Sequence, residues 1–280
     1  MADPTALSGT LAESALQVLG TADARAKAAR SRALAAAWRD GAIGAIGRID
    51  ADVLPDRPAR PQRPELRLPR DMPRRRKGFS PAGRIALLHA LAHIELNAID
   101  LAWDVVARFT DPARAGIDLP LAFADDWVRV GDEEGRHFLL LSDRLAELGA
   151  AYGDLPAHDG LWEASAATAG DLAARLAVVP MVLEARGLDV TPAMIANLRR
   201  AGDDASADIL QIIHDDEIGH VAIGRHWFEH LCAVRNLPPV ETWQSLVRRY
   251  FKGDLKRPFN HASREKAGFS SAFYEPLGVG

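Results

Sequence analysis

Two short stretches decide the fold of this chain: Glu134-Gly-Arg-His137 and Glu217-Ile-Gly-His220. Each sets a carboxylate and an imidazole three residues apart, inside a long segment whose apolar residues recur at helical spacing. On an α-helix, residues at that separation lie on one face, one turn apart. Each stretch is therefore predicted to present a paired Glu and His from one side of a helix.

The composition of the chain favours helices. It has 280 residues, of which 48% are hydrophobic, 26% charged and 6% aromatic, as expected of a globular protein with a sizeable core. This length fits one large domain or two small ones. Alanine and leucine dominate, which favours helix over sheet. The net charge of −4 says little about partners.

Cysteine content and hydropathy bear on where the protein works. The single Cys232 excludes an internal disulfide and a multi-cysteine zinc site. No uninterrupted apolar stretch approaches the roughly 20 residues needed to span a bilayer. The start, Met1-Ala-Asp-Pro-Thr, lacks the charged region and apolar run of a secretory signal. We therefore expect a cytoplasmic protein with no membrane association.

Apolar periodicity, caps and breakers indicate an all-α fold. Ser80-Pro81 and Thr191-Pro192 each read as a capping hydroxyl followed by proline at the first helical position. Pro180 lies inside a predicted helix and is expected to bend it. The predicted helices are one or two within 6–40, then 81–109, 120–149, 165–186, a short one from 191, 203–235 and 240–251.

Proline and arginine content divides the chain further. Prolines recur through residues 52–81 and forbid a regular helix there, so this segment is predicted to be an extended, basic connector. We predict an N-terminal helical extension (1–51), the connector (52–80), a four-helix core (81–236) and a C-terminal helix with a tail packed on the core (237–280). The tail is expected to be ordered because it keeps several aromatic residues, namely Phe259, Phe269, Phe273 and Tyr274.

The two Glu-x-x-His pairs predict a metal site. Two such pairs, with one glutamate from each of two further helices, are the ligand inventory of a carboxylate-bridged di-iron or di-manganese centre in a four-helix bundle. Glu95 and Glu184 supply the further glutamates, each inside an apolar stripe where an unpaired carboxylate would be costly. One metal is assigned to Glu95, Glu134 and His137 and the other to Glu184, Glu217 and His220, with Glu134 and Glu217 as bridges.

Other polar residues near these ligands have several possible roles. Asp216 precedes Glu217 and can orient a ligating histidine. His214 lies one turn before Glu217 and is an extra ligand, a proton-transfer group or, more commonly for an inward polar residue, a histidine satisfied by a hydrogen bond. His89 and His93 point well away from Glu95 and are expected to bond to a neighbouring helix or the connector.

With these residues identified, the chain resembles the ferritin-like superfamily, and more closely a bacterial ferritin-like branch of unknown function. The resemblance covers about residues 60–275 and rests on His89-Ala-Leu-Ala-His-Ile-Glu95, His214-Asp-Asp-Glu-Ile-Gly-His220 and the Pro/Arg-rich approach to the first core helix. It implies a four-helix core that binds two metals. More distantly, Glu184-Ala-Arg186 is similar to a string in the di-iron hydroxylases that modify a tRNA base.

Three functions fit this sequence. The leading hypothesis is a dimetal oxidase or oxygenase, with iron or manganese, that uses oxygen to modify an unidentified organic substrate. The second is a non-catalytic metal binder, ferroxidase or iron-handling protein. The third is a helical scaffold in which the polar residues only specify packing, although clustered glutamates would then repel one another.

The basic segments bear on partners. Arg74-Arg-Arg-Lys77 in the connector, and the tail with Lys252, Lys256, Arg257, Arg264 and Lys266, can bind a small anionic substrate. RNA is the weaker interpretation, because the whole chain is mildly acidic and such segments can instead lie along acidic faces of the bundle. An oxidase would also need an electron donor protein.

Overall fold

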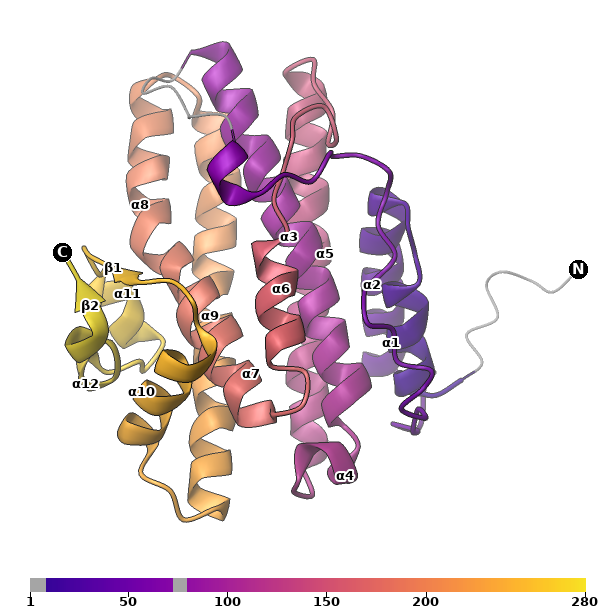
Figure 1. Ribbon diagram of the computed structural model, residues 1–280. Coiled ribbons are helices and arrows are strands. Elements are labelled where there is room, and N and C mark those ends of the chain that lie inside the picture. The colour runs from indigo at the N-terminus through magenta and orange to yellow at the C-terminus, as the bar shows by residue number, and fades with distance from the viewer. Residues whose placement is uncertain (1–8, 73–79) are drawn as a thin grey trace, which may run out of the picture. The chain divides into compact units, whose positions relative to one another are not determined.

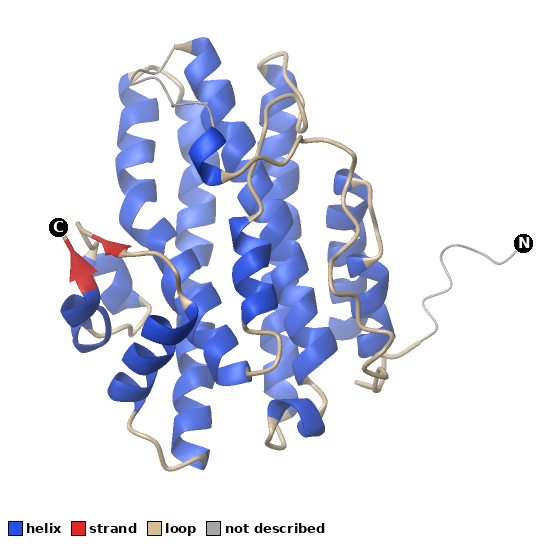
Figure 2. Ribbon diagram, viewed as in Figure 1, coloured by secondary structure: helices blue, strands red, loops and turns tan. Residues whose placement is uncertain are grey.

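The computed structural model describes residues 9–72 and 80–280, and these are mostly helical, which confirms the all-α prediction (Figures 1 and 2). The chain divides into two compact units, Met1–Trp162 and Glu163–Gly280. The basic run Arg74-Arg-Arg-Lys77 lies outside the described residues. The four-part division predicted from the sequence stays a prediction.

The first unit is organised around two long helices. α3 packs along α5, α2 packs against α5, and α1 packs against α3. A short helix, α4, follows α3. The bounds are α1 (Leu11–Leu19), α2 (Ala24–Arg39), α3 (Pro81–Phe109), α4 (Pro112–Ala115) and α5 (Leu121–Glu147). Of the one or two helices predicted within 6–40, the structure has two, and the predicted helices at 81–109 and 120–149 are confirmed.

Side-chain caps fix where these helices begin. Ser80 accepts a hydrogen bond from the Gly83 backbone N–H at the start of α3, with Pro81 at the first helical position. Asp23 caps α2 through the Ala26 N–H, and Thr10 forms a capping box with Glu13 at α1. Each cap satisfies a backbone donor that the first helical turn leaves without an intrahelical partner.

One buried junction joins three helices of this unit. The Trp103 indole N–H donates to Ser31 Oγ over 2.6 Å, and that hydroxyl donates to the Gly131 carbonyl over 2.5 Å. A Cβ on Gly131 would lie 2.6 Å from the Trp103 indole nitrogen, so only glycine fits. Glycine on α5 thus lets the largest side chain of α3 reach a partner on α2.

By length and composition alone, α3 is long and apolar enough to cross a membrane. The core helix of a soluble protein can be equally long and apolar, and 67% of the most apolar window of α3 is buried inside the protein. The finding is consistent with a soluble protein.

Within its described residues 52–72, the proline-rich connector has no regular helix apart from a 3₁₀ turn, η1 (Pro69–Asp71), as predicted for that part of the segment. Leu66 forms a parallel bridge with Ala157. Arg57 pairs with Asp159, and Arg60 lies 2.9 Å from the buried carboxylate of Asp100. These ion pairs fit the prediction that basic connector residues lie along acidic surfaces of the same protein.

The second unit is built on α8 and α9, which pack along each other, while α10 packs against α7 and α12. α6 (Gly160–Ala167) runs across the boundary between the units. Residues 255–256 and 278–279 pair as a two-stranded parallel sheet. The remaining bounds are α7 (Leu172–Val178), η2 (Val179–Glu184), α8 (Ala185–Arg200), α9 (Asp204–Val234), α10 (Pro239–Tyr250), β1 (Leu255–Lys256), α11 (His261–Lys266), α12 (Ser271–Tyr274), η3 (Glu275–Leu277) and β2 (Gly278–Val279).

The predicted helix at 165–186 is wrong in its limits. It is interrupted before Asp171, whose side chain caps α7, and it then continues past Gly187 to the end of α8. No new helix starts at Thr191-Pro192; both residues lie inside α8. The reason is packing: Leu188, Thr191, Ile195 and Leu198 form a buried stripe at helical spacing. Burying this stripe outweighs the propensity cost of Gly187, about 1 kcal/mol, and the hydrogen bond lost at Pro192.

The C-terminal tail is packed, as predicted. Phe269, Phe273 and Tyr274 are all buried. Trp243 on α10 makes edge-to-face contacts with two of them, at centroid distances of 5.5 Å to Phe269 and 5.9 Å to Phe273. Such aromatic pairs add stability beyond their buried area, which helps to hold a tail made of short helices and two-residue strands.

Candidate metal centre

Two helices of the first unit bring three predicted ligands together. Glu95 lies on the face of α3 that also buries Ala92 and Ile99, and Glu134 and His137 lie one turn apart on α5. All three are buried, with exposed fractions of 2% or less. The sequence places these polar side chains inward because each occupies a position in an otherwise apolar helical stripe.

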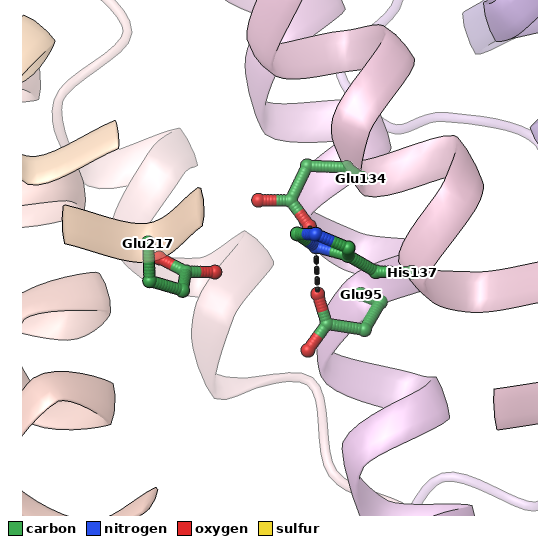
Figure 3. Close-up of side chains that lie close together, drawn as sticks. All are labelled: Glu95, Glu134, His137 and Glu217. Atoms are coloured by element: carbon green, nitrogen blue, oxygen red, sulfur yellow. Dashed lines mark hydrogen bonds and ion pairs between the residues drawn. The ribbon is translucent and has the colours of Figure 1, made fainter. Parts of the chain in front are cut away.

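The side chains of Glu95, Glu134 and His137 lie close together (Figure 3). The His137 Nδ1 atom lies 3.3 Å from Glu95 Oε2 and 3.4 Å from Glu134 Oε2. Each residue offers one ligand atom, and these atoms lie within 4.8 Å of one another. Figure 3 also draws Glu217, which belongs to the second unit and is described below.

The electrostatics of this cluster are unfavourable without a cation. Burial, followed by the negative charge of Glu134, raises the pKa of Glu95 well above its ordinary value. A hydrogen bond from His137 opposes that rise but is the smaller effect. Two carboxyl groups this close together cannot both ionise in a low-dielectric interior unless a positive charge lies beside them.

The donor set fits a metal ion. Two carboxylate oxygens and one imidazole nitrogen suit iron and manganese, which accept both ligand types. A bound cation would also remove the repulsion that raises the pKa of Glu95. This buried Glu/His cluster could therefore hold a metal ion.

The other three predicted ligands belong to the second unit. Glu217 and His220 lie one turn apart on α9, with His220 Nδ1 3.6 Å from Glu217 Oε2. Glu184 is the last residue of the π-helix η2, which packs against α9. The predicted bridging of two metals by Glu134 and Glu217 stays a prediction.

A proline and a glycine set the approach of η2 to α9. Pro180 lies one turn before Glu184, in a segment that is π-helical; the predicted bend of the helix there stays a prediction. A Cβ on Gly224 would lie only 2.3 Å from Pro180 Cβ and Cγ. Glu184 is the last residue of this segment, so its place on the helix surface depends on the π-helical register.

His214 is buried and hydrogen-bonded, the commoner of the outcomes predicted for it. Its Nε2 lies 3.2 Å from the Ser263 hydroxyl, and burial lowers the pKa of its imidazole. Asp216 is half-buried on the same helix. A role for either residue in orienting ligands or transferring protons stays a prediction.

His89 and His93 bond to the segment between α5 and α6. His89 Nε2 accepts a hydrogen bond from the Gly153 N–H over 2.9 Å. His93 Nδ1 lies 2.8 Å from the Tyr152 hydroxyl, and its Nε2 lies 3.0 Å from the His158 carbonyl oxygen. The predicted partners, a neighbouring helix or the connector, were therefore wrong: both histidines bond to the loop between α5 and α6.

Sequence reasoning missed one buried charge network in this unit. Lys27 on α2 pairs with Asp100 on α3, and both side chains are fully buried. Arg60 of the connector contacts the same carboxylate, so a single acid joins three segments. The only signal in the sequence is an aspartate inside the apolar helix 81–109, and nothing local identifies its partners.

A family model described as "Protein of unknown function (DUF455)" matches residues 20–275. The chain belongs to this family. The match includes all six predicted ligands. An uncharacterized protein of Haemophilus influenzae is 44% identical over 210 residues, which cover 75% of this chain and 73% of that protein. No solved structure matches. Membership of the family therefore brings no substrate or reaction with it, and function has to be argued from the site.

Proposed function

We propose that this protein is a dimetal oxidase or oxygenase with a ferritin-like four-helix core, using iron, or alternatively manganese, and oxygen to modify an organic substrate. The observation that carries the proposal is the contact of Glu95, Glu134 and His137, three buried residues whose negative charge a bound cation would balance. Such ligand types in helix interiors are characteristic of dimetal carboxylate proteins.

The number of metals is inferred from repetition in the sequence. Glu184, Glu217 and His220 repeat the composition and order of Glu95, Glu134 and His137, so each triad is proposed to hold one metal ion. When bound, the metals would supply the electrons and open coordination positions that oxygen chemistry needs. An electron donor protein would restore the reduced state.

The protein's own residues would hold and orient that chemistry. In the first triad, His137 directs Nδ1 at both carboxylates, so this nitrogen is the one proposed to ligate. Its surroundings on α3 and α5 are apolar and buried, which excludes water and strengthens every charge interaction there.

The proposed kinship is with ferritin-like proteins and, more distantly, with the tRNA-hydroxylating di-iron enzymes, through Glu184-Ala-Arg186. The proposed location is the cytoplasm, and the proposed substrate is a small or anionic molecule. Fold kinship does not choose a reaction, because one fold hosts many activities.

Elemental analysis of protein purified from iron-supplemented cells tests the proposal. We expect about two irons per chain, as in other dimetal bundles. The Glu134→Gln variant should lose metal, because glutamine keeps the shape but not the charge. Glu147→Gln is the matched control, since Glu147 lies on the same helix with its side chain 63% exposed.

Each possible result of the elemental analysis leads to a different conclusion about the site. Manganese in the same amount keeps the site and redirects the chemistry. Absence of metal under every loading condition, with Glu134→Gln and wild type equally stable, would establish the scaffold hypothesis instead.

Ferroxidase activity is the second candidate, because the donor set suits iron oxidation without any organic molecule. Oxygen uptake by iron-loaded protein distinguishes the two functions. Uptake driven by ferrous iron alone, unaffected by any organic compound tested, supports iron handling. Uptake that requires an organic compound supports an oxygenase.

A further inference from the structure

A pocket of about 180 Å³ lies in the second unit, beside the π-helix η2. One wall consists of three consecutive η2 residues, Met181, Val182 and Leu183. The rest of the apolar lining comes from the C-terminal segment: Phe251, Leu255 and Phe259. The volume is that of about six waters of liquid, which is room for a small organic group. The lining favours a hydrocarbon or aromatic body.

Charged side chains line the same pocket, with cations in excess. The positively charged side chains are those of Arg186, Lys256 and Arg264, and the negatively charged ones are those of Asp189 and Asp254. Asp189 is already neutralised by a bidentate pair with Arg264, in which Nε–Oδ1 and Nη2–Oδ2 are both 2.8 Å. Arg186 Nη1 also lies 3.4 Å from Asp189 Oδ2. The lining as a whole keeps an excess of positive charge, so the pocket attracts an anion.

Arg264 is held rigidly at this site. It is only 3% exposed, and its guanidinium carbon lies 4.3 Å from the Tyr274 ring centroid and 4.9 Å from that of Phe259. Its Nη1 atom is buried and has no hydrogen-bond partner among the described residues. A buried charged donor in that condition is unusual in a folded protein and favours binding of an acceptor.

A backbone carbonyl places the Arg186 side chain at the pocket. Arg186 donates from Nη1 to the Lys256 carbonyl oxygen over 2.8 Å, so the first turn of α8 and strand β1 are tied together at the pocket. Both side chains keep access to solvent: Lys256 is exposed, and the Arg186 side chain is 40% exposed. They can therefore meet a ligand at the rim while Arg264 meets it deeper in the protein.

We propose that this pocket binds a small amphipathic anion. Its carboxylate or phosphate group is held by Arg264, Arg186 and Lys256, and its apolar body lies against the η2 wall and the two phenylalanines. Leu183 of this wall directly precedes Glu184, a proposed metal ligand. Identifying the anion as the substrate rests on the proposed function, whereas binding itself does not depend on metal.

Calorimetric titration of the full-length, metal-free protein tests the inference, with octanoate as the probe and octanamide as its neutral counterpart. We expect one octanoate per chain and at least tenfold weaker binding of octanamide. The double variant Arg186→Gln/Lys256→Gln should weaken octanoate binding by about tenfold or more and leave octanamide unchanged, since only the anion uses these charges. Octyl phosphate, titrated in the same way, shows which headgroup binds more tightly.

Two further variants serve as controls. Arg248→Gln/Lys266→Gln removes the same charge from exposed residues that do not line the pocket, and should bind octanoate as wild type does. Leu183→Trp fills the pocket and should abolish binding of both probes, while a thermal melt confirms that this variant folds. Equal affinity for octanoate and octanamide, or an equal loss in both double variants, would overturn the proposal. Metal loading plays no part in this assay, so its failure and that of the proposed function are distinguishable.

Discussion

The His137 imidazole on α5 lies 3.3 Å, Nδ1 to Oε2, from the carboxylate of Glu95 on α3. Residues more than forty positions apart thus meet in the interior of the first unit, where Glu134 also contributes a carboxylate oxygen 3.4 Å from the same nitrogen. Two buried carboxyl groups beside one imidazole are stable only if bound protons or a metal cation balance their negative charge. The first prediction tests whether protons or a metal cation balance this charge.

Replacing Glu134 with glutamine should raise the melting temperature of the metal-free protein, because its charge is one cause of the raised pKa of Glu95. The expected gain is roughly 2–4 °C for each kcal/mol of repulsion relieved. Wild type should gain about 2.7 kcal/mol from ferrous or manganous ion at 100 times its Kd, and the variant much less. Thermal melts with chelator and with added metal measure both effects. Equal metal stabilisation of the two proteins would contradict the prediction.

The second prediction concerns pH. Burial, followed by the charge of Arg60, lowers the pKa of His93 to about 4 from 6.5. Between these values the unfolded chain binds the proton and the folded protein does not, so stability falls as pH falls from 6.5 to 4, by roughly 3 kcal/mol. His93→Gln should remove this part of the pH dependence in urea unfolding. The same change at exposed His226 should leave the slope as it is in wild type.

The third prediction concerns the approach of η2 to α9. Gly224→Ala should destabilise the protein by about 1–3 kcal/mol, because the new methyl group would lie 2.3 Å from a proline ring that cannot rotate away. Gly219→Ala on the same helix is the control. Apart from its own stretch of helix backbone, its Cβ would meet no atom of the described chain within 4 Å, so alanine should stabilise by up to about 1 kcal/mol. Similar effects of the two substitutions in chemical denaturation would be evidence against a tight contact at Pro180.

The fourth prediction concerns the buried Lys27–Asp100 pair. Lys27→Met should cost about 3–5 kcal/mol, because it removes one partner of a fully buried ion pair. Arg25 on the same helix pairs with Asp143 at 2.8 Å, but both side chains are more than half exposed. Arg25→Met should therefore cost less than about 1 kcal/mol. Chemical denaturation of both variants checks the difference, which would vanish if Lys27 were solvated in solution.

Capping residues and helix breakers in the sequence were sufficient to predict where most helices begin and end. Ser80-Pro81 marks the start of α3, and Gly20 separates the first two helices, because caps and breakers act within a few residues. They were insufficient around residues 165–200. There a cap-like Thr191-Pro192 lies in mid-helix, because burial of a stripe against α9 outweighs the local preference.

The sequence by itself determined the all-α class and the identity of the residues that meet in the first unit, since helical spacing fixes which side chains share a face. Only the tertiary structure decided that Glu95 touches His137, that Arg60 and Lys27 share Asp100, and that Arg264 stacks on Tyr274 beside a pocket. Contacts between distant segments depend on how whole helices pack, and no short stretch of sequence encodes that packing.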